Sequence, residues 1–258
     1  MSREISLRIE LGCGHHPLRL NVSFIVTRRQ SERNKGQCVI NGKTYVQFGA
    51  GLSAPDGWIS YDASPTLRLM RVPIVGGLLC RLAGIATPFP KATQLGDVVK
   101  GLPVKPASVA GAYGSHVLEH LALDDFRTAL RNVYDILEPG GRLRLIVPDM
   151  RGRVERYLES AKAEDAEAVH FLLDDTCLGL RSRPKTIVSR IRSMFGHNHH
   201  YWMWDKAAMV RELESAGFVD IRPCAPGDSA DPAFLIVEDP ARFADNGIVE
   251  LAIEAVKP

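Results

Sequence analysis

Short apolar runs alternate with amphipathic stretches along this chain from position 45 onward. The runs predict strands near 45–48, 58–61, 93–95, 110–114, 142–147, 219–223 and 249–256. Strands that alternate with helices are typical of an α/β domain, which we place at 45–258. Residues 1–44 contain two further β-like runs, "ISLRIEL" and "LNVSFIVT", and we interpret them as an N-terminal β extension.

Two helices are predicted from apolar stripes. The first lies in "DDFRTALRNVYDILEPGG", where residues at i, i+4, i+7 and i+11 form one apolar face: Phe126, Leu130, Val133 and Leu137. Pro139–Gly141 should end it, and a strand should follow at once. The second helix lies in "DKAAMVRELESAG", with three residues predicted to face inward: Met209, Val210 and Leu213. Gly217 is suited to a left-handed cap at its end.

Two basic segments interrupt this pattern, and we interpret both as cap insertions. Residues 66–91 and 176–204 contain no Asp or Glu. The second includes "RPKTIVSRIRSMF", in which an apolar face lies opposite Arg190 and Arg192. A basic amphipathic helix of this kind fits an anionic acceptor or a membrane surface. A cap over the active site is favoured over membrane contact.

Composition excludes several classes of protein. The hydrophobic fraction is 45%, the charged fraction 24% and the formal net charge +2, values that are ordinary for a globular domain. The five cysteines are scattered and form no C-x-x-C pair, which argues against a disulfide framework or a thiolate zinc site. The N-terminus has no signal-peptide core and no run reaches the ~20 residues of a membrane span, so we expect a cytoplasmic protein.

Two glycine turns follow apolar runs, at Gly12–Gly14 and at Gly49–Gly51. Such a turn lets the backbone approach a ligand closely, and the signal strengthens when a neighbouring strand ends in a carboxylate that can accept from ribose hydroxyls. The strand "WISYD" places Asp62 in that position for the second turn only. We therefore predict a nucleoside site at 49–51 and a tight turn between N-terminal strands at 12–14.

Six pieces between residues 45 and 223 occur in a recognisable order: "VQFGAG", "YDAS", "LGDVVKGLP", "GSHVLEHL", "LRNVYDILEPGGRLRLIVPD" and "LESAGFVDI". In these pieces the chain resembles class I S-adenosylmethionine (SAM)-dependent methyltransferases, particularly the methyltransferase type 11-like set. The resemblance implies a Rossmann-like, mostly parallel seven-stranded sheet with a reversed last strand. It also implies that SAM binds at the carboxyl ends of the strands.

The resemblance assigns roles by position. The turn would pass under the methionine part of SAM, Asp62 would hold the ribose, and Asp97 would accept from the adenine amine. Ser115 and His116 would face the sulfonium. The complete set of expected cofactor-binding residues is Phe48, Gly49, Ala50, Gly51, Asp62, Asp97, Ser115 and His116.

The sequence departs from the family pattern at the glycine turn. Gln47 stands where many members carry an acid, and only Leu52–Gly57 separate the turn from Trp58. A helical crossover usually needs ~10 or more residues, so we expect a first helix that is missing or reduced. The short loop, with Pro55 where a phosphate-binding helix would begin, favours a methyl donor without phosphates over NAD.

Three histidines are candidates for catalysis: His116, His120 and His199. Imidazole titrates in the range useful for removing an acceptor's proton. For His120 a packing role is favoured, whereas for His116 the two roles are balanced. His199, with Tyr201 and Trp202, is interpreted either as part of a lid over the acceptor or as aromatic packing. Asp149 is interpreted as a helix N-cap.

No metal site is expected. The histidines of "GHNHHYWMWD" include the adjacent pair His199 and His200 and lack the i, i+4 spacing of a helical metal motif.

The leading hypothesis is a SAM-dependent methyltransferase that acts at oxygen on a small-molecule or saccharide acceptor. A nucleic-acid acceptor is not expected, because the turn after the fourth strand lacks the Asn/Asp-Pro-Pro-aromatic arrangement and no long basic face with aromatics occurs. Two alternatives stay open: an NAD-dependent oxidoreductase, and a non-catalytic nucleoside-binding module of the same fold.

Overall fold

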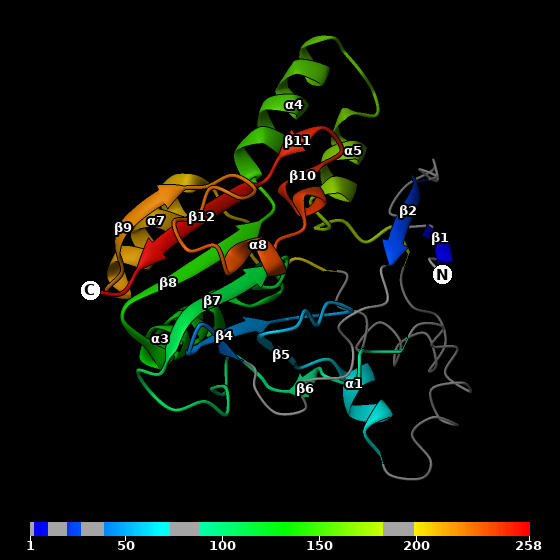
Figure 1. Cartoon of the computed structure of the whole chain (residues 1–258). Coiled ribbons are helices and arrows are strands. Elements are labelled where there is room, and N and C mark those ends of the chain that lie inside the picture. The colour runs from blue at the N-terminus through cyan, green and yellow to red at the C-terminus, as the bar shows by residue number, and fades with distance from the viewer. Residues whose placement is uncertain (1–2, 10–19, 27–38, 73–87, 183–198) are drawn as a thin grey trace.

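The computed structural model describes residues 3–9, 20–26, 39–72, 88–182 and 199–258. An eight-stranded sheet forms the centre of this described part (Figure 1). Seven of its strands follow one another across the sheet: β6 (Gln94–Leu95), β5 (Trp58–Asp62), β4 (Lys43–Phe48), β7 (Val109–Ser115), β8 (Leu137–Val147), β12 (Leu251–Val256) and β9 (Val219–Pro223). The short β3 (Val39–Ile40) pairs with the start of β4.

The direction of the strands matches the sheet that the family resemblance implies. Neighbours from β6 to β8 are parallel, whereas β12 runs antiparallel to both β8 and β9. The predicted seven-stranded, mostly parallel sheet with a reversed last strand is therefore confirmed. From β4 the chain proceeds to β5 and β6 on one side, and from β7 to β8 on the other. The strand order thus reverses between β4 and β7, where open α/β sheets bind their ligands.

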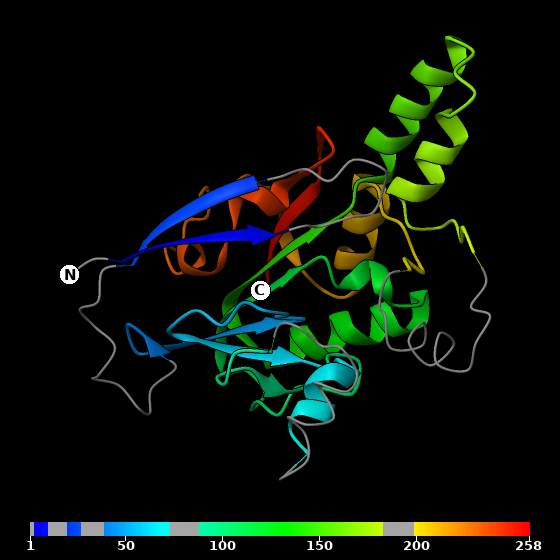
Figure 2. The same cartoon turned by 90° about the vertical axis from the view of Figure 1, so that its right-hand side faces the viewer.

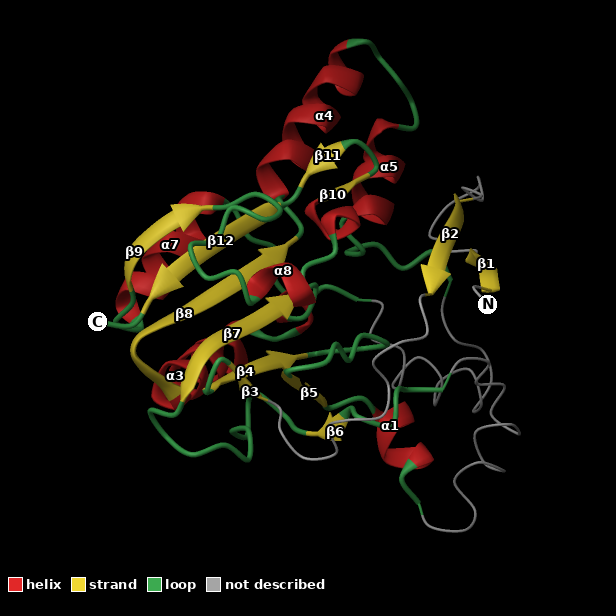
Figure 3. Cartoon of the chain, in the orientation of Figure 1, coloured by secondary structure: helices red, strands yellow, loops and turns green. Residues whose placement is uncertain are grey.

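The connection from β4 to β5 contains no helix. Residues 49–57, all of them described, form turns (Figure 3). The turns are held by backbone bonds from Ser53 N to Ala50 O (2.9 Å) and from Trp58 N to Pro55 O (3.3 Å). The expected reduction of the first helix is confirmed.

Helices α3 (Leu123–Ile136) and α7 (Lys206–Ser215) cover one face of the sheet (Figure 2). All four residues of the predicted stripe are buried. The helix ends at Ile136, however, and Leu137 is already the first residue of β8. Expecting Leu137 on the helix was wrong by one residue: Pro139 disfavours helical backbone at Glu138, and the chain leaves the helix one residue before that. In α7, Met209 and Leu213 are buried, as predicted, and Val210 is partly buried against the same core.

The C-terminal region covers the opposite face. Phe234, at the start of α8 (Phe234–Val237), packs its ring against Trp58, with ring centroids 5.4 Å apart. The 3-10 helix η2 (Pro240–Phe243) follows, and then a hairpin of β10 (Ala244–Asp245) and β11 (Ile248–Val249) leads into β12. The strand predicted at 249–256 is therefore divided, because Val249 pairs within the hairpin.

Helices α4 (Met150–Lys162) and α5 (Ala168–Asp175) lie side by side and project beyond the carboxyl end of β8 (Figures 1 and 2). The Asp149 carboxylate accepts from Gly152 N at 2.9 Å, so its predicted role as N-cap of α4 is confirmed. None of the helices in the described part is both long and apolar enough to cross a membrane.

The remaining elements are short. A six-residue helix α1 (Pro65–Met70) follows β5, and the 3-10 helix η1 (Leu118–His120) follows β7. At the N-terminus, β1 (Arg3–Ile9) and β2 (Leu20–Val26) pair antiparallel, as the two β-like runs predicted. Several predictions fall on residues that lie outside the described part of the chain. They concern the Gly12–Gly14 turn, residues 73–87 of the first insertion, and residues 183–198, which include the basic amphipathic stretch and His197.

Candidate functional site

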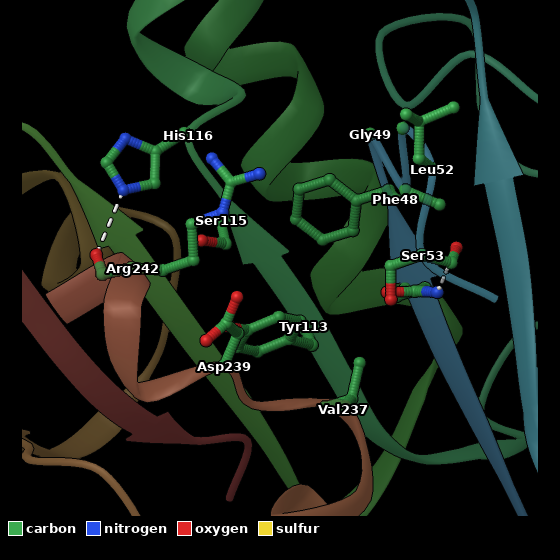
Figure 4. Close-up of a pocket in the computed structure, with 13 residues that line it drawn as sticks. Phe48, Gly49, Leu52, Ser53, Tyr113, Ser115, His116, Val237, Asp239 and Arg242 are labelled. Atoms are coloured by element: carbon green, nitrogen blue, oxygen red, sulfur yellow. Dashed lines mark hydrogen bonds between the residues drawn. The ribbon is translucent and has the colours of Figure 1, made fainter. Parts of the chain in front are cut away.

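A cavity of about 400 Å³ opens at the carboxyl ends of β4 and β7, where the strand order reverses (Figure 4). It is bounded by the glycine turn on one side and by the segment from α8 to η2 on the other. Six of the eight expected cofactor-binding residues line it: Phe48, Gly49, Ala50, Gly51, Ser115 and His116. Asp62 and Asp97 are not among the lining residues.

The glycine turn needs its glycines for different reasons. Both Gly49 and Gly51 have left-handed backbone, with φ of 61° and 54°. A Cβ on Gly49 would lie 2.1 Å from Val117 Cγ2, whereas no atom lies within 4 Å of the corresponding position on Gly51. The first glycine is therefore required by close packing against Val117, the residue just before η1, and the second by backbone conformation alone.

Two buried side chains hold this turn against β5. The Gln47 amide donates to Ser53 O at 2.9 Å and to Ser60 Oγ at 2.6 Å, so this side chain closes the short loop. The Asp62 carboxylate accepts from Gly51 N at 2.9 Å and from Ser64 N at 2.8 Å. Asp62 thus reaches the turn, as expected, although through hydrogen bonds to the protein itself.

Asp97 lies farther along the same edge of the sheet. It follows β6, and its carboxylate accepts from Val99 N at 3.0 Å while Lys100 Nζ lies 3.6 Å away. These contacts form a local turn that ends in an isolated backbone bridge to Gly101. The described residues therefore place Asp97 outside the cavity.

His116 stands at the rim of the cavity with an unusual backbone. Its φ is 53°, and its amide donates to Ile146 O at 2.8 Å, which turns the ring toward η2. Ring Nε2 lies 3.0 Å from Arg242 O and must donate to it, because a carbonyl only accepts (Figure 4). In the neutral ring Nδ1 then carries the lone pair, and it lies 3.7 Å from Glu119 Oε1.

The polar residues of the cavity that were not predicted as binding residues include Tyr113, Asp239 and Arg242. Burial raises the pKa of Tyr113 to about 12, so its phenol is neutral at physiological pH. Asp239 accepts from Ala241 N at 3.0 Å and begins η2, which carries the exposed Arg242. No motif marks Asp239 and Arg242, because the packing of α8 on the sheet alone brings them here.

His120 and His199 do not line the cavity. The structure instead brings Glu119, His120 and His200 together, with potential ligand atoms all within 4.8 Å of one another. Burial raises the pKa of Glu119 to about 8. Burial and the neighbouring His120 lower the pKa of His200 to about 4. Nothing in the spacing of these residues indicated this cluster.

The segment 199–204 packs beside the start of α4 and does not reach the cavity. Tyr201 and Trp202 expose 69% and 42% of their surface, and so neither points into a closed pocket. Trp204 is buried against Phe126, with ring centroids 4.1 Å apart. The ring of His199 places Nδ1 3.3 Å from Cys177 O. Of the two interpretations of this stretch, aromatic packing is the one that applies to Trp204.

No family model matches this sequence, and no curated protein is detectably similar to it. A SAM-dependent methyltransferase of Thermotoga maritima is 14% identical, with 86% of this chain and 85% of that chain covered and a TM-score of 0.40. One from Archaeoglobus fulgidus is 14% identical, with 83% and 86% covered and a TM-score of 0.41. Phosphoethanolamine N-methyltransferase 2 of Haemonchus contortus is 12% identical, with 84% and 49% covered and a TM-score of 0.39. Similarity at this level concerns the fold alone.

Proposed function

We propose that this chain is a SAM-dependent methyltransferase that acts on a small-molecule or saccharide acceptor. One observation carries the proposal: a glycine turn without a following helix borders a cavity where the strand order reverses. The reversal is the ligand-binding position of open α/β sheets, and the bare backbone of the turn admits a ligand closely. The cavity of about 400 Å³ falls within the size range of small-molecule sites.

The absence of a helix within residues 49–57 favours SAM over NAD. A dinucleotide carries a pyrophosphate, which this class of fold binds at a helix N-terminus directly after the glycine turn. Residues 49–57 offer turns there and no helix. SAM has no phosphate and needs only the close approach of the backbone to its methionine part.

We assign Asp62 to hydrogen-bond the ribose hydroxyls of the cofactor. Its two oxygens each accept one backbone hydrogen bond, from Gly51 and from Ser64. An ionised carboxylate has about four lone-pair sites, so two are left for ribose hydroxyls. The same bonds fix the carboxylate beside the turn, which lowers the entropy lost when the nucleoside binds.

We assign the reaction to transfer at oxygen. The acceptor oxygen attacks the sulfonium methyl, the carbon–sulfur bond breaks, S-adenosylhomocysteine leaves, and the acceptor's proton passes to a base. His116 is the assigned base, because it borders the cavity and its bond to Arg242 O leaves Nδ1 unprotonated in the neutral ring. The exposed guanidinium of Arg242 at the same rim suits an anionic acceptor.

Titration calorimetry with SAM, S-adenosylhomocysteine and NAD tests the cofactor. We expect the first two to bind and NAD not to bind. Asp62→Asn should weaken SAM binding by at least ~10-fold, the equivalent of one charge-assisted hydrogen bond. Asp56→Asn, an exposed acid in the same loop, is the matched control and should leave affinity unchanged.

Methyl transfer is tested separately. Incubation with methyl-labelled SAM and a metabolite extract should yield a labelled product heavier by one CH2 unit, and His116→Ala should abolish it while SAM still binds. Binding of NAD in place of SAM would overturn the proposal in favour of an oxidoreductase. SAM binding without any labelled product would leave a non-catalytic nucleoside-binding module.

A further inference from the structure

We propose that Glu119, His120 and His200 form a binding site for a divalent transition-metal ion, with Zn²⁺ as the best fit. Each side chain offers one ligand atom, and all three atoms lie within 4.8 Å of one another. His120 Nε2 is 3.9 Å from Glu119 Oε1, and the ring centroids of His120 and His200 are 5.0 Å apart. Ligands around one tetrahedral Zn²⁺ are about 3–3.5 Å apart, so small side-chain rotations complete the site.

The two imidazoles are oriented as metal ligands usually are. His120 Nδ1 donates to His199 O at 2.9 Å, which directs Nε2 toward Glu119. His200 is hydrogen-bonded to the backbone of Thr176, and its Nδ1 has no hydrogen-bond partner among the described residues. A ligating histidine typically donates its other ring N–H to a backbone carbonyl or carboxylate, which fixes the ring and its tautomer.

Glu119 supplies a second, independent observation. Its side chain is 1% exposed, and neither carboxylate oxygen has a hydrogen-bond partner among the described residues. Burying the ionised form of a carboxyl group without hydrogen bonds is unfavourable unless a charge or a metal compensates it. A cation between Glu119 and the two imidazoles would satisfy both this carboxylate and His200 Nδ1.

The backbone explains how residues 80 positions apart meet. The amides of Tyr201 and Trp202 both donate to Glu119 O, at 2.8 Å and 3.2 Å. These bonds join the segment that carries His200 to η1, which carries Glu119 and His120. The three ligands are therefore positioned by main-chain contacts, as a built site requires.

The donor set selects the ion. Two imidazole nitrogens and one carboxylate suit Zn²⁺ and related first-row ions, whereas Mg²⁺ prefers an all-oxygen octahedral shell. Three protein ligands leave a fourth tetrahedral position open. His116, which lines the cavity, has Nδ1 3.7 Å from Glu119 Oε1, so one residue of the cavity rim borders the three proposed ligands.

If the proposed function holds, the open position would bind the acceptor. A hydroxyl group coordinated to Zn²⁺ ionises far more readily than a free one, and His116 Nδ1 is placed to receive its proton. The acceptor class would then be narrowed to hydroxyl compounds. This extension rests on the proposed function, whereas the metal site itself does not.

Metal binding to untagged, chelator-treated protein tests the site. Titration with Zn²⁺ should give one equivalent, and Co²⁺ should give the visible spectrum of a tetrahedral site with nitrogen and oxygen ligands. Glu119→Gln and His200→Ala should each weaken Zn²⁺ binding by more than about 10-fold. His170→Ala, which removes an exposed histidine of α5, is the control and should bind as the unaltered chain does. Mg²⁺ should not compete at equal concentration.

Glu119→Gln keeps the shape of the side chain, and circular dichroism establishes that each variant is folded. Unaltered Zn²⁺ binding in both Glu119→Gln and His200→Ala, or no Zn²⁺ binding in the unaltered chain, would overturn the proposal. Calorimetry with SAM on the same samples separates the two hypotheses. Zn²⁺ binding without SAM binding refutes only the proposed function, and SAM binding without Zn²⁺ binding refutes only the metal site.

Discussion

Gly49 and Gly51 share a left-handed backbone but have different surroundings. The cost of backbone strain and the cost of steric overlap can therefore be measured separately. Gly51→Ala should lower the free energy of unfolding by about 1–2 kcal/mol, the cost of a left-handed Cβ. Gly49→Ala should lower the free energy of unfolding by a further ~1–3 kcal/mol, because its Cβ would overlap Val117, only 2.1 Å away. Denaturant unfolding of the two variants gives the difference directly, and equal losses would contradict the packing described between the turn and η1.

Gln47 makes a second prediction at the residue scale. Its amide nitrogen donates to Ser53 O and Ser60 Oγ, so Gln47→Glu would place a carboxylate oxygen against a carbonyl oxygen. We expect the free energy of unfolding to fall by about 1–3 kcal/mol, the cost of leaving buried partners unsatisfied. Chemical denaturation measures it. A variant as stable as the unaltered chain would mean that the loop tolerates an acid at position 47.

Some residues of the site could be predicted from the sequence, and others could not. Four cavity residues lie at or just after the end of a strand, where a local pattern is informative: Gly49, Gly51, Ser115 and His116. The meeting of His120 with His200 has no local signature. It depends on hydrogen bonds from 201 and 202 to Glu119 O, which no spacing rule describes.

At the scale of elements, the N-cap of α4 can be tested. Asp149→Ala removes the acceptor of the Gly152 amide and should lower the free energy of unfolding by about 1 kcal/mol. Asp149→Asn should retain most of the stability, because Asn caps helices about as well as Asp. Thermal melts of both variants measure the two effects. Equal losses in the two would indicate that charge, rather than the capping bond, is what matters at this position.

Element boundaries were predicted where one local rule dominates. The apolar stripe of α3 and the glycine after α7 identified these helices, and Gly217 has the left-handed φ of 97°. The sequence was ambiguous where rules compete: Leu137 continues a helical stripe but precedes Glu138-Pro139, and it forms strand instead. The segment 234–243 lacks a strong period, so its position over the sheet could not be predicted.

At the scale of the whole molecule, a network of ion pairs joins three strands and a loop. Arg144 of β8 contacts Glu254 of β12 at 2.8 Å, Asp228 at 3.0 Å and Glu238 at 2.5 Å. Arg222 of β9 also binds Asp228, at 3.0 Å. Partial burial alone would raise the pKa of Asp228, but hydrogen bonds from Arg222, the Ala225 amide and Arg144 lower it to about 2.

This network predicts how stability depends on pH. The pKa of Asp228 is about 2 in the folded chain and ordinarily 3.8, so its contribution is complete above about pH 4 and is lost as the pH falls toward 2. Denaturation between pH 5 and pH 2 should show the stability gap between the unaltered chain and Asp228→Asn narrowing with acid. A gap for Asp228→Asn that does not change with pH would show that the carboxylate's charge contributes nothing.

The sheet as a whole was predicted in strand number, direction and reversed last strand, because the ordered motifs imply a known topology. The cover formed by α8 and η2 was not, because it depends on contacts between distant parts of the chain, such as the hydrogen bond from Trp58 Nε1 to Ala233 O at 3.2 Å.

The antiparallel strand β12 lies between β8 and β9, although β9 precedes it in the chain. During synthesis on the ribosome, β9 is therefore made before the strand that attaches it to the rest of the sheet. A nascent polypeptide halted before position 251 would leave the edge of β8 open, and such edges recruit chaperones or seed aggregates. The order of translation and the order of assembly differ in this half of the molecule, so the sheet can close only after residues 251–256 have left the exit tunnel.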